Sequence, residues 1–136
     1  MSRENVELAR RFLDAWNRRD LETIRALSDP ALEFVNSPTA VEPGTRRGFD
    51  ECTAVLRAQW EILLDGRQEI DRAYDRGDEV IVLGRLSRRM PDSEARIADR
   101  VLNSFTVRDG RFTRFQVLGF GAAEVQDALE AAGLSE

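Results

Sequence analysis

Few residue types in this chain could move a proton. Its 136 residues include no histidine, the 20 basic residues are all arginine, and Cys52 is the single cysteine. An imidazole-assisted nucleophile and a lysine Schiff base are therefore excluded, as are an internal disulfide and a thiolate metal cluster. Because arginine stays protonated, acid–base chemistry would depend on Asp or Glu, on the lone Tyr74 or on water.

Arg85 and Asp99 are the residues whose spacing best fits such chemistry. They lie in two expected strands joined by a turn, and a loop centred on Asp92 sets Arg85 opposite Asp99. A shift of one position would instead set Arg85 opposite Arg100. Like charges directly opposite each other are destabilising, so we favour the first register. It predicts an arginine–carboxylate pair that either performs catalysis or serves as a structural ion pair, since charged side chains are usually buried only in pairs.

The elements that would carry this pair follow from hydrophobic periodicity. Apolar residues recur at helical spacing in four segments, which are 5–17, 21–27, 50–64 and 122–132. A short strand is expected at 32–36, followed by a loop over 37–48. After Gly66 the period changes to two, and strands are expected at 68–74, 79–90, 96–107 and 112–120. The chain is therefore expected to be a single α+β domain over residues 1–136, with helices in front of a curved antiparallel sheet.

The last strand carries two local signals. Asp109-Gly110 indicates a tight hairpin turn before it. The apolar alternation breaks between Phe112 and Phe115, which predicts a β-bulge near Thr113. A bulge reverses the direction of the side chains that follow, so either Gln116 or Val117 points inward.

Three segments carry a family resemblance, at residues 11–20, 41–48 and 107–112. With the order of elements, they resemble the SnoaL-like family of the nuclear transport factor two-like superfamily, which includes ketosteroid isomerases and limonene epoxide hydrolases. The resemblance implies a cone-shaped α+β barrel. In it, three helices of the N-terminal half pack on a strongly curved mixed or antiparallel sheet, with a short C-terminal helix, a pocket between the layers and often a homodimer.

The resemblance can be followed residue by residue. The tyrosine of ketosteroid isomerases falls on Phe12, their general-base aspartate near Phe34 or Asn36, and their second aspartate on Asn103. Phenylalanine donates no hydrogen bond and asparagine is no base, so isomerisation by that mechanism is not expected. Limonene epoxide hydrolases use an arginine and two aspartates around a water. Arg85 with Asp99 is similar in kind, but a second pocket aspartate is missing.

Matching Asn103 to the family directs the strand face with Leu83 and Val101 toward the pocket. The expected pocket residues are Phe12, Trp16, Phe34, Asn36, Leu56, Trp60, Leu83, Val101, Asn103, Phe105 and Val117. Core packing is the alternative role for the two tryptophans, and hydrogen bonding at a strand end is the alternative for Asn36. Glu42 either closes over the pocket mouth or lies in a solvated turn.

Two function classes follow. The first is an enzyme that acts on a small apolar molecule without metal or cofactor, by an isomerase, cyclase or hydrolase step with Asp99 as acid or base and Arg85 beside it. Asp99→Asn would then abolish turnover. The second is a non-catalytic ligand-binding or dimeric assembly module of the same fold.

Charge and hydropathy limit the partners. A net charge of −5 argues against nucleic acid and anionic membranes, and no apolar run approaches the ~20 residues that span a bilayer. A cytoplasmic location is expected, since the first residues lack the apolar core of a signal peptide. Ile81 and Leu83 share one sheet face and Val80, Val82 and Leu86 share the other, which suits a homodimer contact through the sheet.

Overall fold

Three helices in the N-terminal half present apolar stripes to the sheet. The computed structural model describes residues 2–40 and 43–136, and the helices are α1 (Ser2–Asn17), α2 (Leu21–Leu27) and α3 (Phe49–Ile62). Asp20 caps α2 by accepting a hydrogen bond from the backbone N–H of Thr23 at 3.1 Å. Hydrogen bonds from Thr23 also lower the pKa of the Asp20 carboxyl. The expected helices are therefore confirmed.

Six strands form one mixed sheet in the order β2-β1-β6-β5-β4-β3. Their bounds are β1 (Ser28–Asn36), β2 (Gly44–Arg47), β3 (Arg67–Arg76), β4 (Glu79–Arg89), β5 (Arg96–Arg108) and β6 (Arg111–Phe120). β1 pairs with β6 in parallel and all other neighbours are antiparallel. The strand β2 lies inside the segment expected to be a loop. It has only four residues, too few to show a period, and it pairs only with β1 at the sheet edge.

Bulges determine which side chains of the sheet face inward. In β6 the register shifts between Thr106 and Val107, which leaves Thr113 as the extra residue and confirms the expected bulge. Val117 consequently lies on the inner face, whereas Gln116 pairs with Ser104 on the outer one. In β3 the extra residue is Asp71, next to Gly84 of β4. Glycine is required there because a Cβ would collide with the carbonyl oxygen of Glu69.

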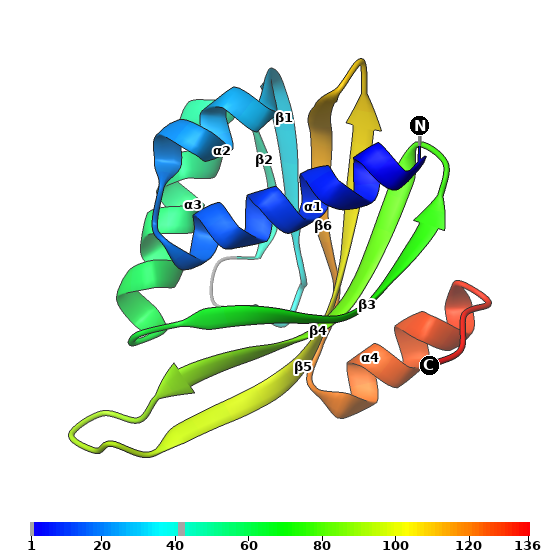
Figure 1. Cartoon of the computed structure of the whole chain (residues 1–136). Coiled ribbons are helices and arrows are strands. Elements are labelled where there is room, and N and C mark those ends of the chain that lie inside the picture. The colour runs from blue at the N-terminus through cyan, green and yellow to red at the C-terminus, as the bar shows by residue number, and fades with distance from the viewer. Residues whose placement is uncertain (1, 41–42) are drawn as a thin grey trace.

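The curved sheet has two differently covered faces. Figure 1 shows α1 and α3 together on the concave side, with α4 (Ala122–Ala131) on the opposite side. The concave side holds the larger hydrophobic core, and α4 packs on Ile81, Leu83 and Leu102. Ile81 and Leu83 are covered by α4, and Val80, Val82 and Leu86 belong to the core on the concave side. A homodimer through the sheet stays a prediction. Of the helices in the described residues, none is long and apolar enough to cross a membrane.

The expected register of β4 with β5 is wrong by one position. Arg85 lies opposite Arg100, and Asp99 lies opposite Leu86. The facing arginines are tolerated because each binds a carboxylate from elsewhere, Arg85 those of β3 and Arg100 that of Glu136. The shift reverses the faces of β4 but not those of β5. Leu86 therefore faces the concave side and Leu83 faces α4.

Candidate functional site

A partly enclosed pocket of about 240 Å³ opens on the concave side of the sheet. The ends of α1 and α3, the segment after β1 and strands β3 to β6 surround it. The lining residues are Trp16, Asn36, Ser37, Thr39, Ala40, Gln59, Ile62, Leu63, Gln68, Leu86, Val101, Asn103, Phe115, Val117 and Phe120. Most of these side chains are apolar, and the polar ones among the described lining residues are all neutral.

Trp16 and Gln59 fix one wall of the pocket. The indole Nε1 of Trp16 donates to Gln59 Oε1 at 3.2 Å, which joins α1 to α3. Trp60 donates from its own Nε1 to the backbone oxygen of Trp16 at 3.1 Å. Both indole N–H groups thus have partners, as burial of tryptophan requires. The bond to Trp16 also sets the Gln59 amide, because its oxygen is engaged and its NH₂ group is the end left for other partners.

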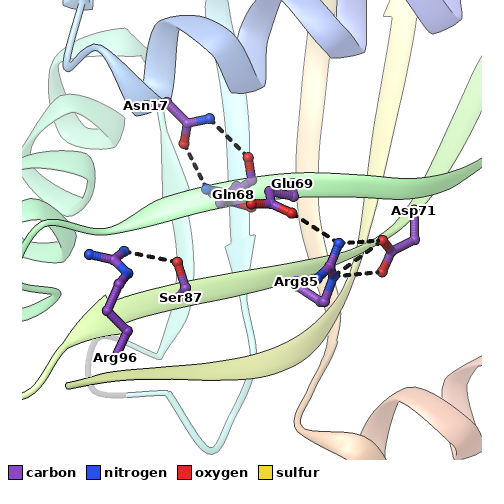
Figure 2. Close-up of polar contacts among 7 residues, drawn as sticks. All are labelled: Asn17, Gln68, Glu69, Asp71, Arg85, Ser87 and Arg96. Atoms are coloured by element: carbon purple, nitrogen blue, oxygen red, sulfur yellow. Dashed lines mark hydrogen bonds and ion pairs between the residues drawn. The ribbon is translucent and has the colours of Figure 1, made fainter.

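Asn103 and Gln68 form the floor on the sheet side. Asn103 is 4 % exposed and donates from Nδ2 to Gln68 Oε1 at 3.4 Å, a long hydrogen bond. Gln68 is held by Asn17, whose side chain donates to the Gln68 carbonyl at 2.9 Å and accepts from the Gln68 N–H at 2.7 Å. Figure 2 shows this two-point contact between α1 and β3. The backbone of Gln68 is therefore fixed, while its amide is held only weakly.

The segment after β1 forms the mouth of the pocket. Ser37 and Thr39 are joined by a hydrogen bond of 2.9 Å between their hydroxyls, and Ser37 Oγ accepts the Thr39 N–H at 3.2 Å. Thr39 also donates to Glu124 Oε2 of α4 at 3.0 Å. Ile62 and Phe120 flank the opening with 50 % and 37 % of their surfaces exposed. The mouth is therefore apolar at its edges and hydroxyl-lined on one side.

The chemistry of this lining is that of binding and orientation. Carboxamides and hydroxyls both donate and accept hydrogen bonds but do not exchange protons near neutral pH. Within residues 2–40 and 43–136 the lining includes no acidic or basic side chain. Glu42, the expected closing residue, lies outside the described residues.

Of the residues expected in the pocket, the structure brings five to its wall. These are Trp16, Asn36, Val101, Asn103 and Val117. Five others, Phe12, Phe34, Leu56, Trp60 and Phe105, are buried in the core on the same side of the sheet. Core packing was the alternative role considered for Trp60. Leu83 was placed on the wrong face and contacts α4 instead.

Arg85 and Asp99, the expected catalytic pair, are not partners. Arg85 lies on the outer face, where it binds Glu69 at 2.9 Å and Asp71 at 3.0 Å, as Figure 2 shows. The hydrogen bond and charge of Asp71, with the charge of Glu69, raise the Arg85 pKa. Asp99 lies on the concave face and pairs with Arg88 at 3.0 Å, both side chains being 31 % exposed. The bulge in β3 brings Asp71 to Arg85. This contact involves a third strand, so the pairing of β4 with β5 alone could not predict it.

Several lining residues were not expected from the sequence. Gln59 had a visible signal, because it lies on the apolar stripe of α3 among Leu56, Trp60 and Leu63, where a polar residue is unusual. Leu86 would have followed from the correct register of β4. Gln68 and Thr39 had no signal, since each reaches the pocket through tertiary contacts with α1 and α4.

Two other features are less suited to a ligand. A groove of about 590 Å³ lies on the outside between α2 and the start of α3. It is larger, but two of its arginines already pair with carboxylates, Arg25 with Asp50 and Arg47 with Glu33. Cys52 is fully buried, and burial raises the pKa of its thiol to about 11, so the thiol is a structural group.

Comparison with solved structures places this geometry among known folds. An NTF2-like protein of unknown function from Burkholderia pseudomallei has 22 % identity and a TM-score of 0.76, covering 92 % of this chain and 96 % of that one. A putative SnoaL-like polyketide cyclase from Jannaschia sp. has 18 % identity and a TM-score of 0.76, covering 96 % and 94 %. An LEH-like epoxide hydrolase from M. tuberculosis has 21 % identity and a TM-score of 0.72, covering 96 % and 92 %.

These identities, all below 25 %, show a shared fold. No curated protein matches the chain. The family model of the SnoaL-like domain matches residues 9–115, a range that runs from α1 into β6 and includes the floor of the pocket. With helices packed on one side of a six-stranded mixed sheet and a short C-terminal helix, the chain belongs to the SnoaL-like domain family.

Proposed function

We propose that the pocket binds a small neutral molecule with an apolar body and a carbonyl group, which the carboxamides orient. The observation that supports this most is the presence of Gln59 and Asn103 in a lining whose side chains are mostly apolar and whose polar members, among the described residues, are all neutral. Burial of the apolar body contributes roughly 25 cal/mol per Å². A carbonyl that meets an amide N–H avoids the cost of an unpaired buried polar group.

The size of the pocket limits the ligand. A volume of about 240 Å³ is below the range of about 300–1,000 Å³ that is usual for ligand sites. It equals roughly eight water molecules at about 30 Å³ each, so a ligand has on the order of ten non-hydrogen atoms. One substituted ring fits this limit. The neighbours named as a polyketide cyclase and an epoxide hydrolase agree with a small-molecule pocket, although at 18 % and 21 % identity they share the fold alone.

Acetophenone, one aromatic ring with one carbonyl, is a suitable probe. We expect saturable binding by calorimetry and shifts of amide resonances confined to pocket residues. Asn103→Leu, checked for folding by circular dichroism, is expected to weaken binding about tenfold, the effect of one lost hydrogen bond. Gln126→Leu on the exposed side of α4 is the matched control. Equal affinity of wild type and Asn103→Leu would contradict the role of Asn103, and absence of saturable binding would contradict the pocket itself.

A second function, proton abstraction from the bound molecule, is supported by the place of Asp99. It lies opposite Leu86 and two residues from Val101 on the same strand face, and both of those residues line the pocket. As a base, the carboxylate would take a proton from the methyl group of acetophenone, and a deuteron from D₂O would replace it. We expect this exchange to be faster than in buffer and to be lost in Asp99→Asn while binding persists. Exchange at the buffer rate would leave binding as the function.

A further inference from the structure

Glu124 lies in the first turn of α4, outside the pocket lining, but both of its carboxylate oxygens reach the pocket mouth. Oε1 accepts the backbone N–H of Phe120 at 3.2 Å, and Oε2 accepts the hydroxyl of Thr39 at 3.0 Å. Gly119 allows this approach, since a Cβ there would lie 2.9 Å from the backbone of Glu124. One carboxylate therefore connects β6 with the segment after β1.

The carboxylate fixes the direction of a short chain of hydrogen bonds. A carboxylate only accepts, so the Thr39 proton is committed to Glu124. In the bond between the two hydroxyls, Ser37 must then be the donor. Ser37 Oγ also accepts the N–H of Thr39. Both hydroxyl protons are used within the protein, and what these oxygens present to the pocket is lone pairs.

The wall formed by Gln59 has the reverse polarity. The oxygen of Gln59 accepts the indole N–H of Trp16, so the amide NH₂ of this lining residue is the group that can donate to a ligand. This wall donates, whereas the wall of Ser37 and Thr39 accepts. The pocket is therefore polar in a definite direction, although no charged side chain among the described residues lines it.

We propose that Glu124 determines ligand specificity by keeping the Ser37 and Thr39 wall an acceptor. The ligand class follows: a small ring compound with a carbonyl directed to Gln59 and a hydroxyl or N–H donor directed to Ser37. This inference rests on the proposed binding function and adds the donor end of the ligand. Ser37 is only 7 % exposed. A ligand without a donor would therefore leave the remaining lone pair of Ser37 Oγ unpaired and shielded from water. Thr39 is exposed, and water moderates its share of the effect.

A matched probe pair tests the proposal. 4-Hydroxyacetophenone and 4-methoxyacetophenone share the ring and the carbonyl, but the methyl ether has lost the donor proton. We expect wild-type protein to bind the hydroxyl compound about fivefold more tightly, the effect of one hydrogen bond at a partly exposed site. Affinities are measured by calorimetry, and the ratio of the two dissociation constants is the readout.

Glu124→Gln is expected to reverse the chain. The Gln oxygen keeps the Phe120 N–H and its amide donates to Thr39. The Thr39 hydroxyl then donates to Ser37, and the Ser37 proton is released toward the pocket. The preference for the hydroxyl compound should fall about fivefold, to parity or below. The methyl group of 4-methoxyacetophenone is the same whichever protein is titrated. Its bulk therefore cancels when the affinity ratios of wild type and Glu124→Gln are compared.

Two further variants separate polarity from stability. Thr39→Val disconnects Ser37 from Glu124 without changing any residue of α4, and it should also reduce the ratio. Asp127→Asn removes an exposed acid from the same helix and should leave the ratio unchanged. An unchanged ratio in both Glu124→Gln and Thr39→Val would overturn the role of Glu124 while the binding function stands. Failure of both probes and of acetophenone to bind any variant would overturn the binding function and this inference together.

Discussion

The concave face of the sheet has a packed end and an open end, and the same helix contributes to both. At the packed end Phe12 of α1 meets the rings of Phe105, Phe112 and Phe115 at centroid distances of 5.3, 5.5 and 5.4 Å. One turn later Trp16, on the same stripe of α1, borders the pocket. Within four residues, one helix face changes from filling the core to lining a cavity.

The difference lies in the residues opposite the helix. Phenylalanines from β5 and β6 fill the packed end, whereas Asn103, Gln68 and Gln59 occupy the equivalent space at the open end. Hydrogen bonds hold the Gln59 and Asn103 carboxamides in place, and a pocket remains beside them. The packed end therefore supplies stability, and the open end supplies space with directed polar groups.

The largest expected effect is at the packed end. Phe12→Ala removes the ring that three others contact, and it should lower the free energy of unfolding by about 3–5 kcal/mol. Urea denaturation measures the change. Phe120→Ala at the exposed pocket mouth is the control and should cost less than about 1 kcal/mol. Equal losses in the two variants would mean that the packed end is not the source of stability.

A matched pair on β5 compares the two ends directly. Val107 and Val101 are 4 % and 5 % exposed, but only Val101 borders the pocket. Val107→Ala should cost about 2.5 kcal/mol, since a new cavity adds to the lost transfer free energy. Val101→Ala should cost about 1 kcal/mol because it enlarges a space that already exists. The opposite order in chemical denaturation would contradict the distinction between the ends.

The burial of Cys52 can be tested through the pH dependence of stability. Burial raises the pKa of its thiol from 9.0 to about 11, so in the unfolded chain the thiol ionises first. The contribution to stability is complete below pH 9, and it is lost as the pH rises through about 11. As the pH rises from 9.0 to about 11, the urea midpoint of the wild type should fall more steeply than that of Cys52→Ala. Alkylation of the folded protein at pH 8 should also be slow, and rapid alkylation would show that the thiol is accessible.

The smallest effect is expected at Arg85. It points to the outer face, whereas its chain neighbour Leu86 points into the pocket. Arg85→Gln should leave acetophenone affinity unchanged within error, and Leu86→Trp should block binding by filling the cavity. Calorimetric titration of both variants checks this. A loss of affinity in Arg85→Gln would place its ion pair in the binding mechanism after all.

Local patterns predicted the fold well. The apolar stripe with Phe12 and Trp16 indicated α1, and Asp109-Gly110 indicated the hairpin, whose φ angles of 53° and 76° favour these residue types. The broken alternation before Phe115 located the bulge at Thr113. Each of these signals arises from a few consecutive residues, so no distant partner was needed to interpret it.

The site was predicted less well because distant contacts decide it. The register of β4 with β5 was chosen to avoid arginines facing each other, which is a sound rule for two isolated strands. In the folded protein, however, Arg85 pairs with carboxylates on β3, and Arg96 pairs with Asp65, which follows α3. These partners make the other register acceptable. Because the register was wrong by one position, Leu83 was predicted in the pocket where Leu86 lies, and Arg85 was predicted as the partner of Asp99 in place of Arg88. The β5 residues Val101 and Asn103 were placed correctly.

The single parallel pairing, β1 with β6, has a consequence for folding kinetics. It joins residues 33–35 to residues 114–116, so most of the chain must close as a loop before the two strands meet. The hairpins of β3 to β6 need only short loops and are expected to form first, since non-local pairing is slow. Asn36, Ser37 and Thr39 follow β1 directly. The hydroxyl wall of the pocket is therefore completed late, and a folding intermediate would hold the sheet without a finished binding site.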